Sequence, residues 1–450
     1  MAERIGDGLE RVVRVSESER KTTSSAVRAK YEKYLFPSAT TYYAEALTLE
    51  SGKGCTVRDF DGKSYLDFFG GILTLSVGHA NEAVNAAVRT QMERLGHVST
   101  LYPTLPMVDL AEKLVHLTPG NLEKAFFCTS GTEADETAVA LAQAHTGRTG
   151  MIALRHGYSG RSLLAQALGG SSKYRAVPTQ VAGIAHAHAP YCYRCPLGLR
   201  YPSCDVQCAR DIEDLIATTT TGEVAGIIVE PILGVGGFIV PPPGWMQVAV
   251  EIVRKHGGIF ICDEVQTGFG RTGKMWGIEH DAVQPDIMTM AKGIANGLPI
   301  SAIVTTSPIA RAWTAGNIST FGGNPVSCAA ANATIDTIVA VRLVENAAAM
   351  GALLREGLEA LKTKHTLIGE VRGRGLMQGL ELVGDEKGGD RSPAPGATLR
   401  LFEETKRRGL LVGLGGLRGN VVRVAPPLVV DRGQVTDALR ILDESLGAIA

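Results

Sequence analysis

The segment Gly258-Ile259-Phe260-Ile261-Cys262-Asp263-Glu264-Val265-Gln266 joins a short apolar run to two acidic residues. Twenty-nine residues after Asp263, a second apolar run leads into Met290-Ala291-Lys292-Gly293. Continuous apolar runs of this length, bounded by polar residues, are typical of strands that are buried on both faces. The sequence therefore predicts that Asp263 and Lys292 each stand at the end of a buried strand.

Further apolar runs on both sides of this segment alternate with longer stretches, several of which have helical periodicity, for example Gln247–Lys255. The runs that we interpret as strands are Lys124–Cys128, Met151–Leu154, Gly226–Val229, Ile259–Cys262, Ile287–Met290 and Ala302–Thr305. This alternation predicts the α/β class, with a mainly parallel sheet between two layers of helices. We assign the sheet to a large domain over residues 71–329.

The carboxyl edge of this expected sheet carries four polar residues. They are Ser130, Glu230, Asp263 and Lys292, and each follows one of the apolar runs. In open parallel sheets, ligands bind just beyond the carboxyl ends of the strands. The shared location therefore predicts one ligand site at this edge.

The two ends of the chain have a different pattern. Tyr42–Phe69 contains alternating segments around the turn Asp61-Gly62, which indicates a small antiparallel element. The pair Asn324-Pro325 offers a cap and a first-turn proline, so it predicts the start of a long helix. We expect residues 1–70 and 330–450 to form one small α+β domain built from both termini.

Length and composition indicate a globular protein with more than one hydrophobic core. The chain has 450 residues, 45% hydrophobic and 20% charged, and its formal net charge is −1. A nearly neutral chain lacks the basic face that nucleic acid requires, so we expect no nucleic-acid partner. No apolar stretch is long enough to span a bilayer, and residues 1–40 are polar, without an apolar signal core. We therefore expect no membrane partner, a partly ordered N-terminal arm and a cytoplasmic location.

The eight cysteines fall into two groups. The first consists of thiols among apolar neighbours, as in a reducing compartment: Cys55, Cys128, Cys262 and Cys328. The second group is clustered as Cys192-x2-Cys195-x8-Cys204-x3-Cys208, a spacing that also fits a tetrahedral zinc site or a disulfide. Because its flanks are rich in tyrosine and proline, we predict a packed structural loop without a metal.

A second polar motif is Cys128-Thr129-Ser130-Gly131-Thr132-Glu133-Ala134-Asp135-Glu136, where a strand ends and a helix starts. Ser130 and Glu133 have capping-box spacing, and a helix N-terminus offers free N–H groups with partial positive charge. Gly131 lets an anion approach the backbone, and hydroxyls at Ser130 and Thr132 can add hydrogen bonds. An ordinary capped helix has the same pattern, but the position at the ligand edge favours a phosphate site.

Asp263 and Lys292 together suit an aromatic aldehyde cofactor. A lysine can form a Schiff base with the aldehyde, an aspartate can hold a proton on the ring nitrogen, and pyridoxal phosphate (PLP) has both groups. Taken alone, the pair also fits a helix cap and a solvated surface lysine. The phosphate motif at the same edge favours the cofactor.

In combination, these motifs resemble the class III, or ω, aminotransferases of PLP fold type I. The resemblance runs from about Tyr42 to the C-terminus, and its motifs occur in the family's order: Ser130–Glu136, Arg155-His156-Gly157-Tyr158, Glu230-Pro231, Asp263–Gly273, Lys292-Gly293 and Thr320–Pro325. The segment Asp67–His79 is most similar to the alanine–glyoxylate branch, which also accepts β-amino acids. The chain departs from the pattern at Asp135, where many members have Asn, and at Ser159, where His is usual.

The resemblance implies a role for each residue around the cofactor. Lys292 would form the Schiff base and move the substrate Cα proton, and Asp263 would pair with the protonated pyridine nitrogen. Gln266 would donate a hydrogen bond to the phenolic oxygen. Val265 would pack beneath the ring and Tyr158 would stack above it, although a tyrosine here also fits an ordinary core position.

The resemblance also implies how the phosphate is bound and how subunits associate. The phosphate would sit on Ser130, Gly131 and Thr132, at the start of the helix. Thr320 resembles a residue that reaches the same phosphate from a neighbouring subunit. We therefore expect a homodimer with shared active sites, and we leave open whether dimers pair into tetramers.

Three residues are candidates for substrate binding. Arg423, in Val421–Pro427, resembles the arginine that binds a substrate carboxylate, and a plain surface arginine is the alternative. Glu230 matches a family position that gates the carboxylate pocket, and a strand-end glutamate paired with an arginine is the alternative. Ile72 lies in the segment Phe69–Leu75, which we expect to contribute to substrate choice.

These roles imply a PLP-dependent transaminase that works by ping-pong half-reactions. The amino group would move from an amino acid or an ω/β-amino donor to an oxo acid, namely pyruvate, glyoxylate or 2-oxoglutarate. An aminomutase, decarboxylase or phospho-lyase of the same fold would share the cofactor residues and is the alternative. A nicotinamide dehydrogenase is disfavoured, because Gly413–Gly416 lacks the glycine order of a dinucleotide-binding turn.

Overall fold

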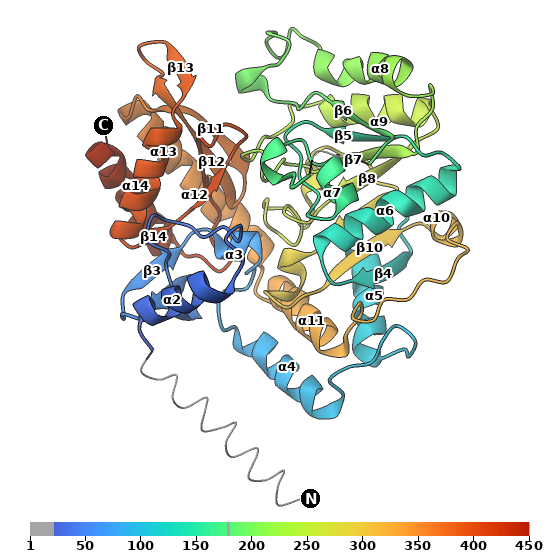
Figure 1. Cartoon of the computed structure of the whole chain (residues 1–450), viewed down its shortest axis with the longest axis horizontal. Coiled ribbons are helices and arrows are strands. Elements are labelled where there is room, and N and C mark those ends of the chain that lie inside the picture. The colour runs from blue at the N-terminus through green and yellow to red at the C-terminus, as the bar shows by residue number, and fades with distance from the viewer. Residues whose placement is uncertain (1–21, 178–180, 450) are drawn as a thin grey trace, which may run out of the picture.

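A seven-stranded sheet organises the larger part of the molecule in this computed structural model, which describes residues 22–177 and 181–449 (Figure 1). Its strands are β4 (Lys124–Cys128), β5 (Met151–Leu154), β6 (Ile184–Ala187), β7 (Gly226–Val229), β8 (Ile259–Asp263), β9 (Ile287–Met290) and β10 (Ser301–Thr305). The order is β4-β10-β9-β8-β7-β5-β6, and only the two pairings of β10 are antiparallel. The expected mainly parallel α/β sheet is confirmed.

All six expected strands are present, and β6 is an additional one. The sequence Ile184-Ala185-His186-Ala187 has a single large apolar side chain, so its apolar run was too weak to read as a strand. It pairs in parallel with β5 because the neighbouring strand offers a complete ladder of backbone partners.

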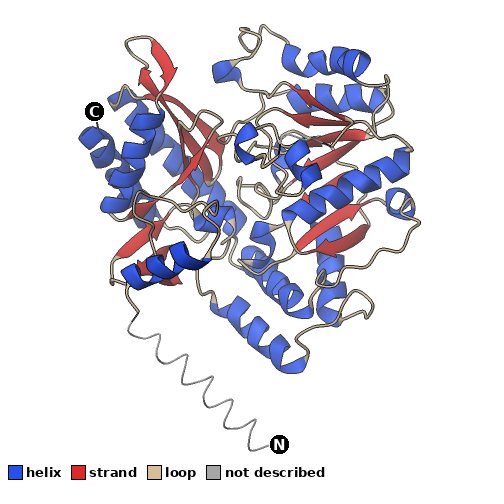
Figure 2. Ribbon diagram, in the orientation of Figure 1, coloured by secondary structure: helices blue, strands red, loops and turns tan. Residues whose placement is uncertain are grey.

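Helices cover both faces of this sheet, as the two blue layers in Figure 2 show. On one face, Ile228 and Ile261 pack in a cluster with α6 (Gly131–Thr146). On the other, Ile227 and Phe260 belong to the main core. That core includes the buried stripes of α8 (Gln207–Thr219) and α9 (Trp245–Lys255). Adjacent residues of one strand point to opposite faces, which explains why the runs are apolar at every position.

Strand direction brings the predicted site residues together. Strands β7, β8 and β9 are parallel to one another, and β4 has the same direction because it is separated from β9 by the antiparallel β10. The residues that follow these four strands therefore lie at one edge of the sheet.

Strands from both ends of the chain form the rest of the molecule. The hairpins of β1 (Leu49–Lys53), β2 (Thr56–Asp59) and β3 (Ser64–Asp67) are antiparallel, as expected, and β3 pairs in parallel with β14 (Leu410–Leu411). A second sheet has the order β11-β12-β16-β15, with β13 added to β12. Its strands are β11 (Ile368–Arg374), β12 (Met377–Asp385), β13 (Asp390–Pro393), β15 (Gly413–Gly415) and β16 (Val421–Val424).

The remaining helices pack around these sheets. They are α2 (Ser24–Tyr34), α3 (Gly70–Leu73), α4 (Glu82–Arg94), α5 (Leu105–Leu117), α7 (Leu163–Leu168), α10 (Ser307–Arg311), α11 (Pro325–Ala340), α12 (Leu343–Lys364), α13 (Pro395–Arg407) and α14 (Arg432–Ile449). The expected cap of α11 is confirmed, since Asn324 Oδ1 accepts hydrogen bonds from Val326 N at 2.9 Å and Ser327 N at 3.1 Å. Helices α12, α13 and α14 lie together beside the second sheet (Figure 1).

A buried ion network joins the second sheet to the larger part of the molecule. Glu381 of β12 accepts hydrogen bonds from Tyr191 and Arg194, which precede α8, and from Arg372 of β11 at 2.6 Å. The Arg372 Nε donates to Gly237 O at 2.8 Å, in the loop after β7. Because the Glu381 side chain is fully buried, its charge depends on these partners.

The expected N-terminal arm over residues 1–40 falls largely on residues 1–21, outside the described residues. Within the described ranges, no single helix is both long and apolar enough to cross a membrane. Only α11 and α12 taken together, across a bend of 64°, satisfy that test by length and composition.

Candidate active site

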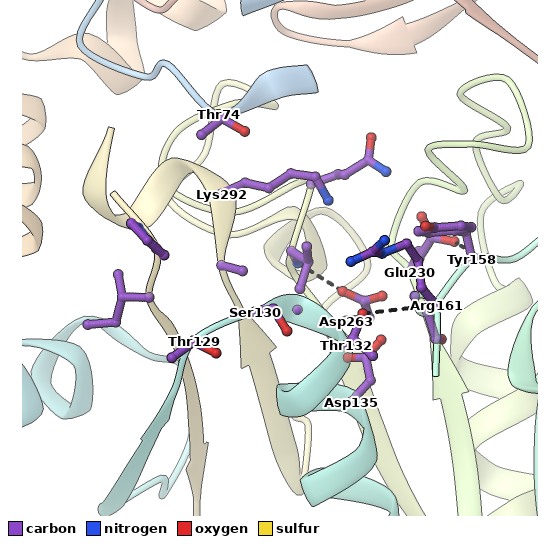
Figure 3. Close-up of a pocket in the computed structure, with 18 of the residues that line it drawn as sticks. Thr74, Thr129, Ser130, Thr132, Asp135, Tyr158, Arg161, Glu230, Asp263 and Lys292 are labelled. Atoms are coloured by element: carbon purple, nitrogen blue, oxygen red, sulfur yellow. Dashed lines mark hydrogen bonds between the residues drawn. The ribbon is translucent and has the colours of Figure 1, made fainter. Parts of the chain in front are cut away.

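A cavity of about 330 Å³ lies at the carboxyl edge of the seven-stranded sheet (Figure 3). Ser130, Glu230, Asp263 and Lys292 all line it, and they come from the ends of β4, β7, β8 and β9. Small-molecule pockets usually have volumes of roughly 300–1,000 Å³. The predicted ligand edge is therefore a real concave site, assembled from residues that are far apart in the sequence.

Asp263 is held as an oriented, buried acceptor. Its side chain is only 4% exposed, and Oδ1 accepts a hydrogen bond from Val265 N at 2.9 Å. Burial raises the pKa of Asp263 to about 6, while the Val265 N–H and the charge of Lys292 limit the rise. This carboxylate is suited to face a cationic ring nitrogen, because a buried charge is stabilised by an opposite one.

Lys292 adopts a strained backbone at the end of its strand. Its φ is +44°, a value that non-glycine residues rarely adopt and that occurs preferentially at functional sites. Ser76 packs against Gly293, where an added Cβ would lie 2.7 Å from Ser76 Oγ, so the next position requires glycine. Burial lowers the pKa of Lys292 despite the nearby carboxylates, so its ammonium group loses a proton more easily to give the nucleophilic amine.

The opposite side of the cavity is the N-terminus of α6. Ser130 is the cap and its Oγ accepts from Glu133 N at 3.3 Å, whereas Glu133 Oε2 accepts from Thr129 N at 2.6 Å. Thr132 Oγ1 accepts from Arg161 N at 3.4 Å, which brings a cationic residue to this end. Free helix N–H groups, hydroxyls and an arginine are the donors that a phosphate needs.

The middle of the cavity suits a flat ring. An added Cβ on Gly131 would meet Val265 Cγ1 at 3.2 Å, so Val265 lies beside the phosphate end. The buried Gln266 Oε1 has no hydrogen-bond partner within the described chain. Tyr158 meets Tyr174 edge to face at 5.1 Å on the far side. The residues present therefore fit pyridoxal phosphate, and their individual roles remain predictions.

Glu230 is buried at the end of β7, and its role as a gate of the carboxylate pocket stays a prediction. Its Oε1 accepts from Tyr158 N at 3.0 Å and its Oε2 from Gly234 N at 2.8 Å, and it pairs with no arginine among the described residues. Burial and the charge of Asp263 raise the pKa of Glu230 to about 8. Glu230 lines the cofactor cavity. Val235, in the loop that follows Glu230, lines the neighbouring larger cavity.

That larger cavity, of about 1,220 Å³, shares Lys292, Tyr158 and Gln266 with the cofactor cavity. Ile72 lines it, in a turn whose φ values are positive from Gly70 to Leu73. This strained turn is fixed by Asp67, whose Oδ1 accepts from Phe69 N at 3.0 Å and Gly70 N at 2.9 Å. Substrate reaching Lys292 through this cavity would therefore pass Ile72.

Arg423 is the charged group of the larger cavity. It is 5% exposed, which is inconsistent with the surface-arginine alternative, and its Nε donates to Leu414 O at 2.9 Å. Its guanidinium lies 4.8 Å from the Phe69 ring centroid and 5.5 Å from that of Phe238. Nη1 has no partner within the described chain, and burial lowers the pKa of Arg423. An unpaired buried cation of this kind is a site for an anion.

Thr320 does not reach the cofactor cavity of its own chain. It is exposed and does not line the cavity, in a loop held by Thr100 and Ser319, where Ser319 N donates to Thr100 Oγ1 at 3.2 Å. Its predicted contact with the phosphate therefore requires a second subunit.

Several residues of the two cavities were missed in the sequence. They include Arg161 in the cofactor cavity and Tyr42 and Tyr174 in the larger one. Each stands outside the motifs, so no signal pointed to it. Glu264 belongs to a motif but is structural: its carboxylate accepts from Gly277 N at 2.9 Å and Ile278 N at 2.8 Å.

The clustered cysteines line a separate, small cavity of about 20 Å³. All eight cysteines of the chain are free thiols. Within residues 22–177 and 181–449, no three His, Cys, Asp or Glu side chains are arranged to hold a metal ion.

Comparisons with known proteins place these features in a family. The model of the family described as aminotransferase class-III matches residues 38–446. The chain is 41% identical over 425 residues to alanine–glyoxylate aminotransferase 2 homolog 2, a mitochondrial protein of Arabidopsis thaliana, covering 94% of this chain and 88% of the relative. It is 37% identical to acetylornithine aminotransferase of Mycobacterium leprae, covering 90% and 92% of the two chains.

Solved structures of similar chains have the same fold. A Bacillus anthracis aminotransferase superimposes with a TM-score of 0.89 at 31% identity, covering 94% of this chain and 98% of the other. An (S)-enantioselective ω-transaminase from Thermomicrobium roseum gives 0.88 at 32% identity, covering 95% and 99%. A phospholyase from Arthrobacter in complex with phosphoethanolamine also gives 0.88 at 32% identity, covering 94% and 99%.

The expected resemblance, fold type I, cofactor and amino-transfer activity are thereby confirmed. The chain belongs to the class III aminotransferases, which are PLP-dependent transaminases.

Proposed function

We propose that this transaminase takes an amino donor that bears a carboxylate and transfers its amino group to a small oxo acid. The observation that carries the proposal is the buried guanidinium of Arg423, whose Nη1 has no hydrogen-bond partner among the described residues, in the cavity that also holds Lys292. An arginine fork binds a carboxylate through two parallel hydrogen bonds, which also fixes the orientation of the donor. Glyoxylate and pyruvate are the acceptors to test first, because a relative of this chain is named for alanine and glyoxylate.

The protein's own groups have distinct tasks in this reaction. Bound pyridoxal phosphate supplies an electron-withdrawing ring that stabilises negative charge at the substrate Cα. Lys292, at the β9 end of the cavity, would accept and return the Cα proton, and its lowered pKa suits this role. Asp263 keeps the ring nitrogen protonated. Arg423 orients the donor so that the Cα–H bond faces Lys292.

The two half-reactions share one site, so the oxo acid binds where the donor did. Its carboxylate would meet the same Arg423, because this is the only guanidinium among the described residues lining the larger cavity that is buried. Binding of donor and acceptor is then mutually exclusive, as ping-pong kinetics require.

The test is a donor-by-acceptor panel with wild type, Arg423→Gln and the control Arg418→Gln, an exposed arginine five residues away that lines neither cavity. We expect Arg423→Gln to lower kcat/KM for carboxylate donors by about 10- to 100-fold, the value of a lost charge-assisted hydrogen bond. Primary amines without a carboxylate should be affected by less than about 3-fold on the same basis. Equal losses for both donor classes would contradict the proposal.

A phospho-lyase is the second candidate, because the Arthrobacter relative of that activity has the same fold and similar identity. It needs no oxo acid, whereas a transaminase stops after one half-reaction without it. Phosphate released from phosphoethanolamine in the absence of an acceptor would establish the lyase. The panel therefore includes this substrate with and without glyoxylate.

We propose that the working unit is a homodimer with shared active sites. The loops around Thr320 expose the apolar side chains of Leu101, Tyr102, Ile318 and Phe321, a surface that a second copy would bury. Light scattering measures the assembly, including the pairing of dimers into tetramers. Lys292→Ala and Thr320→Asp should each be inactive alone and regain activity on mixing, because a mixed dimer has one intact site.

We also propose a cytoplasmic location. The support is that all eight cysteines are free, as thiols are in a reducing compartment. Cell fractionation followed by detection of the protein tests this, and recovery in an organelle or secreted fraction would contradict it.

A further inference from the structure

Asp135 is a buried carboxyl that the reaction described above does not use. It lies in the first turns of α6, is 1% exposed, and lines the cofactor cavity beside Asp263 (Figure 3). Its Oδ1 accepts a hydrogen bond from Thr289 Oγ1 at 2.8 Å. Thr289 of β9 is the register partner of Asp263 in β8, so the three side chains meet at one point of the sheet.

Asp135 and Asp263 lie against each other, because both line the cofactor cavity and Thr289, which donates to Asp135, is the register partner of Asp263. An ionised carboxylate only accepts hydrogen bonds, so two ionised carboxylates cannot bond to each other. Both groups are almost fully buried, and two like charges at contact distance in such surroundings repel strongly. One proton must therefore lie between Asp135 and Asp263.

The surroundings of the two carboxyls decide which one carries that proton. Asp263 receives an N–H from Val265 at 2.9 Å and faces the ammonium group of Lys292, and both stabilise its negative charge. Asp135 accepts a hydrogen bond from the neutral Thr289 hydroxyl, and the carboxyl of Glu230 lies in the same cavity. The charge is therefore more stable on Asp263 and the proton on Asp135.

We propose that Asp135 is a positioning residue that stays protonated and donates a hydrogen bond to Asp263, which fixes the charge and orientation of Asp263 toward the cofactor ring. The proposal rests on the assigned cofactor only for this last step, since the proton is present in the protein without it. Burial and the charge of Asp263 also raise the pKa of Asp135 well above its usual value.

A neutral Asp135 also balances the charges of the cavity. The titratable side chains that line it are Asp135, Asp263, Glu230, Lys292, Tyr158 and, exposed at the phosphate end, Arg161. Burial raises the pKa of Glu230 to about 8, so at neutral pH it is mostly protonated as well. The pair Asp263 and Lys292 is then left as one negative and one positive group, the arrangement that a buried site tolerates.

The test compares Asp135→Asn with Asp135→Leu. Asparagine keeps an acceptor for Thr289 and an N–H donor for Asp263, so it imitates a protonated aspartic acid. Leucine has a similar volume and neither group. The control is Glu136→Gln, the next residue of α6, whose Oε1 accepts from Ser162 Oγ at 2.5 Å and which does not line the cavity.

The first readout is infrared spectroscopy of the protein without cofactor. Wild type should show absorption of a protonated carboxyl at neutral pH, and Asp135→Asn should lose part of that band while Glu136→Gln keeps it. An unchanged band in Asp135→Asn would overturn the proposal, whatever the enzyme's substrate. Because this measurement uses neither cofactor nor substrate, its outcome does not depend on the transaminase assignment.

The second readout is the pH titration of the visible absorption band of the protein loaded with cofactor. Asp135→Asn should shift its midpoint by less than about 0.5 pH unit and retain cofactor affinity within about 3-fold. Asp135→Leu should weaken cofactor binding by at least about 10-fold, because Asp263 loses a donor. If Asp135 were ionised, Asp135→Asn would remove a charge near Lys292 and shift the midpoint by about one unit or more. Should the leucine variant fail to fold, Asp135→Asn alone still decides between these outcomes.

Discussion

The two cavities meet at Lys292 but are built in different ways. The cofactor cavity consists mainly of residues that follow the strands of one sheet, so each motif in the sequence delivers one group to it. The larger cavity draws on Thr40–Ala44, Phe69–Ile72, Leu399–Glu404 and Arg423, which come from both ends of the chain. The groups that suit the cofactor therefore follow one local pattern, a polar residue directly after a buried strand. The lining of the larger cavity, where we expect substrate choice to be made, depends instead on how distant segments pack.

This comparison predicts that changes in the cofactor cavity affect every substrate equally. The largest effect is expected for Lys292→Ala, which removes both the covalent link and the proton-transfer group. We expect kcat to fall by about 10³-fold or more for all donors. Steady-state assays and the visible spectrum measure this, with the exposed Lys274→Ala as the matched control. A spectrum like that of wild type in Lys292→Ala would show that another lysine forms the link.

The buried ion network around Glu381 joins the second sheet to the larger part of the molecule. Breaking this network should affect stability and not substrate choice. Glu381→Gln leaves Arg372 and Arg194 without their buried partner, so we expect unfolding to become easier by about 3 kcal/mol. Although burial opposes it, the cationic partners hold the pKa of Glu381 below its usual value. Its contribution is therefore complete above the ordinary glutamate pKa and is lost as the pH falls through the lower folded value.

Denaturant unfolding of wild type and Glu381→Gln between pH 3 and 7 checks this join. The difference between the two proteins should be largest at neutral pH and should shrink below about pH 4. Glu345→Gln, at an exposed ion pair with Arg342, is the control and should change stability by less than about 1 kcal/mol. A constant difference across the range would mean that the charge of Glu381 is not what stabilises the join.

A smaller effect on the cofactor side is expected for Gly131→Ala. The new Cβ would lie 3.2 Å from Val265 Cγ1, so Val265 must move toward the space of the ring. We expect PLP affinity to fall by about 10-fold, with no change in the preference among donors. Titration of the cofactor-free protein with PLP measures this affinity. The control Gly447→Ala, where an added Cβ would meet no atom within 4 Å, should leave the affinity unchanged.

The smallest effect is expected on the substrate side, for Tyr42→Phe. The Tyr42 hydroxyl accepts a hydrogen bond from Leu414 N at 3.4 Å, Leu414 O accepts one from Arg423 Nε, and the Tyr42 ring stacks on Phe69 at 5.8 Å. Loss of the hydroxyl should raise KM by about 3-fold for carboxylate donors and leave PLP affinity unchanged. A loss of PLP affinity instead would show that the two cavities are not as independent as their construction indicates.

Sequence patterns predicted much of the fold because strands buried on both faces have a simple signature. Six of the seven strands of the large sheet matched apolar runs, and β6 was missed because Ala185 and Ala187 give little hydrophobic signal. The cofactor groups followed from the same signature, since each came directly after a run. The packing of Tyr42 and Phe69 near Arg423 gave no such signal, because contacts between residues hundreds of positions apart leave no local pattern.

The sequence by itself determined the cofactor chemistry, through an acid and a lysine that follow buried strands and a glycine-containing helix start. Only the tertiary structure decided the charge states of the site: it brought Asp135 against Asp263, and it left Nη1 of Arg423 buried without a hydrogen-bond partner in the described part of the chain. The physical reason is that charge in a protein depends on burial and on neighbours in space. Those neighbours come from strands and loops whose separation in the sequence carries no information about their distance.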